Sequence, residues 1–134
     1  MPDKLSFSKI FNDLDNAISV TQNRNAVIAG NISNIDTPGY RPKDINFKEA
    51  LAQALESDDA MNLTKTNPGH IDMKMNPQGI EAFEEKGEWN GYNWVSIDKE
   101  MTKLTENNLM YREAVEVLLR KIALIKEVIK EGGR

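Results

Sequence analysis

Apolar side chains recur in alternating steps of four and three residues along the last third of the chain, from Ile97 to Ile129. A repeat averaging about 3.5 residues keeps one stripe of a helix on one side when the helix supercoils about a partner. At about 1.5 Å per residue, such a helix is on the order of 50 Å long. The pattern therefore predicts a helix over residues 96–131 that packs against another long helix, from this chain or from a neighbour. The repeat positions are Ile97, Met101, Leu104, Asn108, Tyr111, Val115, Leu118, Ile122, Ile125 and Ile129.

Both ends of this predicted helix carry recognisable signals. Ser96 can act as the N-cap, and Asp98 and Glu100 place negative charge in the first turn, where it suits the helix dipole. Gly132 and Gly133 stand at the other end, as expected for a C-terminus.

Asn108 interrupts the apolar repeat, and two interpretations stay open. A single buried asparagine can fix the register or the number of partners in a helix bundle. The alternative is a polar residue that is tolerated at a loosely packed level.

A second long helix is predicted over residues 5–35, where Phe7, Leu14, Thr21, Ile28 and Ile35 are spaced by seven. The two predicted helices have similar lengths, so packing one along the other would bury both stripes. We expect Leu14, Ile18 and Ile28 to face the C-terminal helix. Gly30 then indicates a close contact between helices more than a weak point in one helix.

The middle of the chain, residues 36–95, is less regular. Pro38 fits the second position of a turn and Gly39 the third, where positive φ is needed. A short helix is predicted from Phe47 to Leu55, ended by residues 57–59. Beyond it, Ile71 and Met73 give a weak strand signal, and Asn90-Gly91 favours a hairpin. The expected fold is therefore mainly α: one elongated domain, 1–134, with long terminal helices paired as an antiparallel coiled coil around an irregular or small β-hairpin centre.

The composition reduces the classes of function and partner that the chain can have. The net charge is -4 and lies along the whole chain without a basic stripe, which argues against nucleic acid as a partner. Hydrophobic residues make up 40% of the chain and aromatic residues 7%. This apolar content is low for a compact core but suits an elongated or oligomeric protein. There is no cysteine, no membrane-spanning run and no signal peptide, so sequence signals alone favour the cytoplasm.

Candidate chemistry is sparse. His70 is the one histidine, and a metal or acid–base site around it would need further ligands that the sequence does not supply. We expect no catalytic residue, no metal, no cofactor and no small-molecule substrate. Trp89, Tyr92 and Trp94 form an aromatic group that indicates either local packing or a contact surface.

Residues 29–40, AGNISNIDTPGY, resemble the N-terminal signature of bacterial flagellar rod and hook proteins. Residues 66–70, 95–101 and 106–111 are similar to segments of the proximal-rod members of that family. The resemblance covers almost the whole chain and weakens between residues 81 and 93. The signature residues are Asn31, Asn34, Thr37, Pro38, Gly39 and Tyr40.

The resemblance implies a structural subunit and not an enzyme. It implies a helical tube in the basal-body rod, spanning the periplasm, with terminal helices lining a central channel as coiled coils. It also implies type III export without a cleaved signal peptide, which overrides the cytoplasmic expectation. Phe7 and Phe11 match a short element recognised by the export gate, although both also suit helix packing.

The partners implied are further copies of the chain, other rod proteins, the hook–basal body adaptor protein, and the MS ring and export gate at the rod base. Two alternatives remain at this point: another axial rod subunit, or a soluble coiled-coil adaptor or chaperone.

Overall fold

The structure of the chain is a computed structural model that describes residues 3–60 and 81–133. In these residues the order of elements is α1 (Asp3–Ser33), β1 (Lys43–Asp44), α2 (Phe47–Ala60), β2 (Phe83–Glu84) and α3 (Ile97–Gly132). The mainly helical fold, with two long terminal helices and a short middle helix, is confirmed. Predicted features around His70, Ile71 and Met73 lie outside the described residues.

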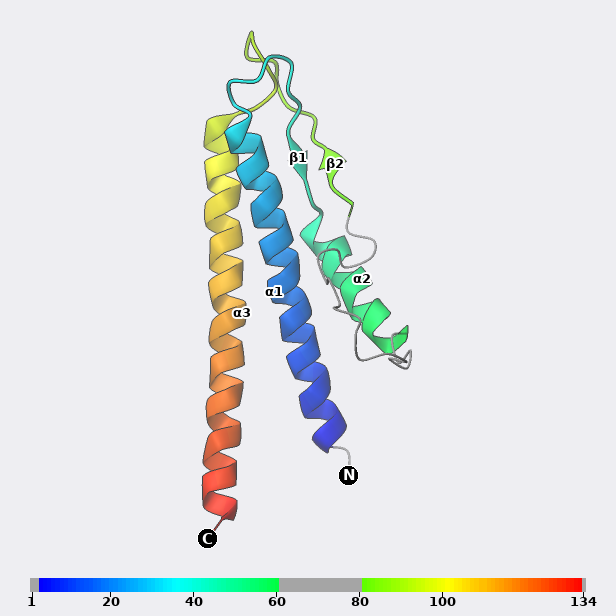
Figure 1. The fold of residues 1–134 in the computed structure, drawn as a ribbon, viewed down its shortest axis with the longest axis vertical. Helices are drawn as coiled ribbons and strands as arrows, with labels where there is room; N and C mark the ends of the chain where they lie inside the picture. Colours follow the sequence, from blue (N-terminus) through cyan, green and yellow to red (C-terminus); the bar gives the residue numbers. More distant parts are fainter. Residues whose placement is uncertain (1–2, 61–80, 134) are drawn as a thin grey trace, which may run out of the picture.

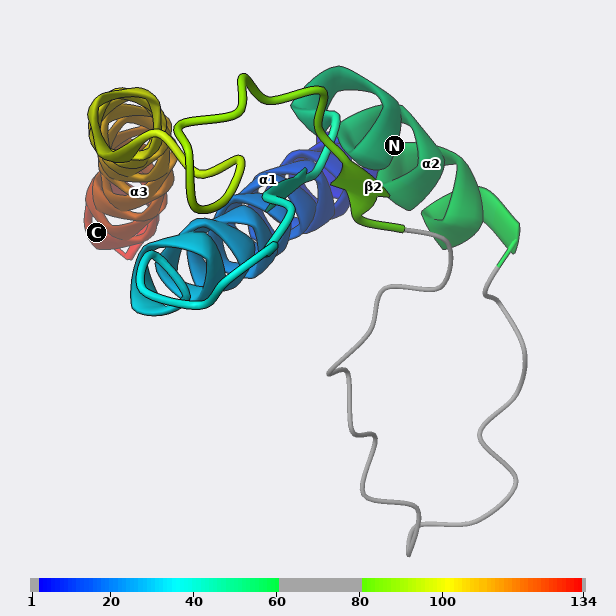
Figure 2. The ribbon, with the colours of Figure 1, turned by 90° about the horizontal axis from the view of Figure 1, so that it is seen from above.

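The molecule is elongated, and its two long helices run in opposite directions (Figure 1). The chain ascends along α1, passes through loops at one end, and returns along α3, so both termini point toward the other end. Figure 2 shows α1 between α3 and α2. We call the end where α1 finishes and α3 begins the apex.

The apolar core lies between α1 and α2. Val20, Ile45, Ala50 and Ala54 form a buried cluster, and Val27 and Phe47 pack against it. Ile45 precedes α2 and Ala50 lies in its first turn, so their shared burial fixes how the chain enters this helix. The prediction that residues 57–59 end the helix was wrong, because α2 continues to Ala60. Serine and aspartate are only weakly unfavourable in a helix and do not break it as proline does.

The less exposed stripe of α3 differs from the predicted repeat. Glu100 and Asn107 are buried, whereas Met101, Asn108 and Tyr111 are exposed. Further along α3 the repeat and the stripe coincide, since Val115, Leu118, Ile122 and Ile125 are all half-buried. A straight helix drifts by about 20° per heptad relative to a 3.5-residue repeat. A seam that matches the less exposed side of α3 near Leu118 has therefore rotated away from that side near Met101.

This rotation corrects the interpretation of Asn108 within the chain. The buried asparagine is Asn107, one position earlier. The antiparallel helix pair is present, while the coiled-coil geometry that the repeat suggests stays a prediction.

Of the two alternatives for the middle of the chain, irregular or a small β-hairpin, the structure has the irregular one at Asn90-Gly91. The two short strands are β1 and β2, which pair antiparallel through Lys43 with Glu84 and Asp44 with Phe83. Asn90 and Gly91 instead form a turn, in which the Asn90 side chain accepts hydrogen bonds from the N–H groups of Tyr92 and Asn93, each at 2.9 Å. Asparagine can close a turn with its own side chain, so no strand ladder is needed.

Two further expectations at the helix ends need correction. Ser96 stands at the N-cap of α3 with an extended backbone, but its side chain makes no capping hydrogen bond. At Gly30, an added Cβ would meet no atom within 4 Å among the described residues, so this glycine is not a close contact between α1 and another part of the chain.

The turn at Gly39 follows the prediction. Gly39 has φ +69, and the N–H of Tyr40 donates to the carbonyl of Thr37 at 3.3 Å. Positive φ at the third turn position favours glycine, because a Cβ there approaches the following carbonyl.

Replacing each glycine by alanine should give opposite results. Gly30→Ala should raise the free energy of unfolding by about 1 kcal/mol, because alanine favours the helix and its methyl group meets open space. Gly39→Ala should lower it by about 1 kcal/mol, because alanine must adopt a left-handed conformation. Urea unfolding of both variants beside the wild type measures this, and a destabilised Gly30→Ala would contradict the open environment described here.

Candidate functional site

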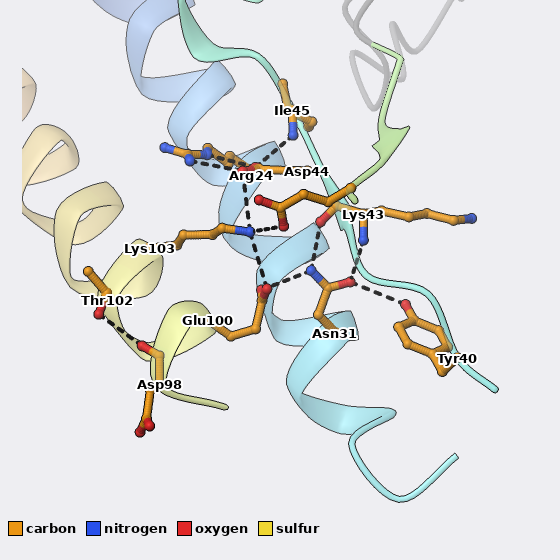
Figure 3. Close-up of polar contacts among 11 residues, drawn as sticks. Arg24, Asn31, Tyr40, Lys43, Asp44, Ile45, Asp98, Glu100, Thr102 and Lys103 are labelled. Carbon is orange, nitrogen blue, oxygen red and sulfur yellow. Dashed lines mark hydrogen bonds and ion pairs between the residues drawn. The ribbon is translucent and has the colours of Figure 1, made fainter. Parts of the chain in front are cut away.

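A buried polar cluster joins α1, β1 and α3 near the apex (Figure 3). We define it as Arg24, Asn31, Asp44, Glu100 and Lys103. These residues come from three segments that are far apart in the sequence, and the hydrogen bonds and ion pairs among them connect those segments.

Asn31 on α1 is the centre of the cluster and is fully buried. Its Nδ2 donates to Glu100 Oε2 at 2.9 Å and to the Lys43 carbonyl at 2.6 Å. Its Oδ1 accepts from the Lys43 N–H at 2.9 Å and from the Tyr40 hydroxyl at 3.3 Å. The side-chain amide of Asn31 thus bonds both the N–H and the carbonyl of Lys43, as the backbone of a neighbouring strand would. The same amide also bonds Glu100 on α3. One side chain therefore positions β1 and α3 against α1.

The charged residues of the cluster are paired across the same junction. Arg24 binds Asp44 with two hydrogen bonds, Nε to Oδ1 at 2.9 Å and Nη2 to Oδ2 at 3.1 Å. Lys103 lies 3.2 Å from Glu100 Oε1 and 3.6 Å from Asp44 Oδ2, and it also binds Glu85. The side chains of Arg24, Asp44 and Lys103 are only 12%, 9% and 13% exposed. Removing one member would leave an uncompensated charge out of water, which is costly.

The pKa values follow from these contacts. Burial alone would raise the pKa of Asp44, but hydrogen bonds from Arg24 and the Ile45 N–H, with the charges of Arg24 and Lys103, lower it overall. Burial alone would lower the pKa of Lys103, but hydrogen bonds to Glu85 and Glu100 raise it overall. Both groups are therefore held in their charged forms.

A second set of contacts fixes the signature turn. Asn93, fully buried, donates from Nδ2 to the carbonyls of Ile35 at 2.6 Å and Thr37 at 3.3 Å. The Gly39 N–H donates to the Tyr92 carbonyl at 2.9 Å. The segment that precedes α3 thus holds the loop that follows α1.

The aromatic group packs locally at the apex. The Arg41 guanidinium lies 4.5 Å from the centroid of the Trp94 ring, and the ring centroids of Trp89 and Trp94 are 4.5 Å apart. The Tyr92 hydroxyl donates to the Asp36 carbonyl at 2.8 Å. Trp89 and Tyr92 nevertheless remain about half exposed.

The structure separates the residues that the sequence predicted as one packing set. Ile28 is buried, and Leu14, Ile18, Leu104, Val115, Leu118, Ile122 and Ile125 are half-buried. Met101, Asn108 and Tyr111 are exposed, as are Thr37, Pro38 and Gly39 of the signature; Asn34, Tyr40 and Phe11 are half-buried.

Several residues that hold the fold together were missed. Arg24, Asp44, Lys103, Asn93 and Asn107 were not among the predicted site residues. A weak signal existed for Lys103, which lies three residues after Glu100 at the start of α3. Each of the five also has a partner on a distant segment of the chain, and no local pattern reveals that contact. Among the described residues, no group of histidine, cysteine or acidic side chains could hold a metal.

Comparisons with known proteins identify related sequences. A family model described as flagella basal body rod protein matches residues 14–41, which include Arg24, Asn31 and the signature turn. The chain is 34% identical over 129 residues to the flagellar basal body rod protein FlgB of Bacillus subtilis (strain 168), with 94% of this chain and 97% of that protein covered. It is 29% identical over 141 residues to FlgB of Escherichia coli (strain K12), with 99% and 100% covered.

These relatives show that the chain is a flagellar basal body rod protein. Within this class the chain belongs to the FlgB family and is a structural subunit of the proximal rod. Membership of this family decides against the two alternatives that the sequence left open.

Replacing Asp44 by asparagine should lower the free energy of unfolding by about 3 kcal/mol at pH 7, because Arg24 and Lys103 lose their shared carboxylate. Since folding lowers the pKa of Asp44, its contribution is present above the ordinary value of 3.8 and is lost as the pH falls through the lower folded value. The gap between wild type and Asp44→Asn should therefore close in acid. Denaturant unfolding across this pH range measures it.

Asp98→Asn serves as the control, because Asp98 is an exposed carboxylate in the first turn of α3. Asp98→Asn should lower the free energy of unfolding by about 0.5 kcal/mol, because it removes a negative charge that interacts favourably with the helix dipole. Equal losses for Asp44→Asn and Asp98→Asn at pH 7 would contradict the importance of the cluster.

Proposed function

We propose that the subunit joins the rod by packing the exposed apolar side chains of α3 against helices of neighbouring rod subunits. The product is a stiff tube that carries torque and surrounds the export channel. Neighbours of this kind are further copies of the chain and other rod proteins, together with the hook–basal body adaptor protein and the MS ring and export gate at the rod base.

The observation that supports this proposal is the exposed apolar surface on both flanks of α3. Met110, Val117 and Leu124 are exposed and spaced by seven residues, and Val128 extends this stripe. On the opposite flank Ile97, Met101 and Leu119 are exposed. At about 100° per residue, Met110 and Leu119 lie on opposite sides of the face that holds Asn107.

A helix that is apolar on three sides is typical of a buried helix. Here α1 covers one side only. Contiguous exposed apolar surface marks an interaction site, and burying one such side chain contributes about 2 kcal/mol. Long helices also depend on packing for their stability. We therefore infer that neighbouring helices complete the packing of α3 in the assembled rod.

Export is the second part of the proposal. We infer that the subunit reaches the rod, across the periplasm, through the type III apparatus and without a cleaved signal peptide. No helix among the described residues is long and apolar enough to cross a membrane. Phe7 is 45% exposed and Phe11 half-buried on α1, so Phe7 is the more accessible of the two for a receptor.

Leu124→Glu tests assembly separately from folding. Leu124 is 54% exposed, so the change should alter the free energy of unfolding by no more than about 0.5 kcal/mol. It should nevertheless prevent rod assembly and swimming when the variant replaces the wild type, because a charge would be buried against a neighbouring helix. Leu118→Glu, at a half-buried position, should impair both folding and assembly.

The matched control is Ala123→Glu, which adds the same charge at the adjacent exposed residue, on the polar side of α3. Cells carrying Ala123→Glu should swim normally. Normal swimming with Leu124→Glu would refute the proposed contact.

Phe7→Ala should reduce export of the subunit several-fold while leaving its folded stability nearly unchanged. The chain is measured outside the cytoplasm and in whole cells, so a loss of export is distinguished from a loss of expression. Phe83→Ala is the control, because Phe83 is 49% exposed but lies outside the N-terminal segment. Undiminished export of Phe7→Ala, or an equal loss with Phe83→Ala, would count against recognition at Phe7.

A further inference from the structure

The face of α3 that contacts α1 changes character along its length. Near the apex it presents Glu100, Lys103 and Asn107, which are buried or nearly so. From Val115 onward the less exposed side of α3 carries aliphatic side chains, among them Leu118, Ile122 and Ile125. We call Glu100, Lys103 and Asn107 the polar third of this face.

Each member of the polar third finds its partner in α1 or in the strands. Glu100 accepts from Asn31 at 2.9 Å, and Lys103 lies 3.6 Å from Asp44. Asn107 donates from Nδ2 to the carbonyl of Thr21 on α1 at 2.7 Å. These partners exist only where α3 lies against α1 of a folded chain.

Asn107 is not explained by stability. It is 1% exposed, and its Oδ1 has no hydrogen-bond partner among the described residues. A buried polar atom without a partner is unfavourable, and an aliphatic side chain at this position would avoid that cost. In helix pairs a single buried asparagine is retained because it selects the partner or register at the expense of stability.

The competing partner to be excluded is α3 of a second copy. At about 100° per residue, Leu118, Ile122 and Ile125 lie on the same side of α3 as Asn107, and an apolar stripe of this kind also suits the pairing of two α3 helices. In a pair of two α3 helices that met through this side, the polar third would be buried without Asn31, Asp44 or the Thr21 carbonyl. Burying these polar groups without their partners would make that pairing less favourable. Specific helix interfaces reject wrong partners in this way.

We propose that Asn107, supported by Glu100 and Lys103, is a specificity-determining residue that directs α3 to α1 of its own chain and away from α3 of another copy. The proposal rests on the proposed function in one respect only: rod assembly brings many copies of α3 close together. The selection keeps the apolar flanks of α3 available for correct neighbours.

The test uses the full chain with Asn107→Leu, and Asn108→Leu as the matched control. The two asparagines are adjacent, but Asn107 is buried and Asn108 exposed. Sedimentation velocity and circular dichroism are measured against protein concentration, which detects pairing of α3 whether or not the isolated subunit is fully folded. Asn107→Ala is included in case leucine does not fit the space of asparagine.

We expect Asn107→Leu to dimerise, with a gain of helix, at a concentration at least about tenfold lower than Asn108→Leu or wild type. Asn107→Ala should shift in the same direction. Self-association that matches wild type in both Asn107 variants would overturn the proposal, as would equal self-association of Asn108→Leu, since added apolar surface would then be the cause. The readout needs no flagellum, so it can fail while the Leu124→Glu test of the proposed function succeeds.

Discussion

The side-chain amide of Asn31 is the interaction on which the rest of the structure depends. It contacts the carboxylate of Glu100, both backbone groups of Lys43 and the hydroxyl of Tyr40 from a fully buried position. Buried polar groups are unfavourable unless they are satisfied, and here a single residue satisfies groups from the other long helix, the strand and the signature turn. Because these contacts converge on one side chain, α1, β1 and the start of α3 are fixed relative to one another, and Lys103 is placed where it binds both Glu100 and Asp44.

The two ends of the molecule are therefore built differently. Near the apex, the helix pair is held by satisfied polar contacts and by the turn that Asn93 binds. Toward the termini, α3 has half-buried aliphatic side chains on one side and large apolar side chains exposed on both flanks. Such an arrangement suits a structural subunit of a rod, since directional contacts set the geometry within one chain while exposed apolar surface is left available for non-directional contacts with other chains.

Much of this fold could be predicted from the sequence, and the failures have physical causes. The repeat of seven residues predicted α1 and α3, and the Pro38-Gly39 pair predicted the turn with its positive φ. The seven-residue repeat predicted Asn108, not Asn107, as the buried asparagine. A strict seven-residue spacing does not account for the rotation of a straight helix relative to a heptad seam. The polar cluster was missed because Asn31 and Glu100 are 69 residues apart, and nothing local marks them as partners. Strands β1 and β2 are two residues long, too short to show alternation.

Polar contacts fix the apex, and we propose that neighbouring subunits cover the far half of α3. Amide hydrogen exchange of the subunit, free and in assembled rods, tests it most directly. In the free subunit, protection should be strongest around Asn31 and the residues from Glu100 to Asn107, and weak beyond Val117. Assembly should then protect the far half of α3. Uniform protection along α3 of the free subunit, or no added protection beyond Val117 in the rod, would contradict the account.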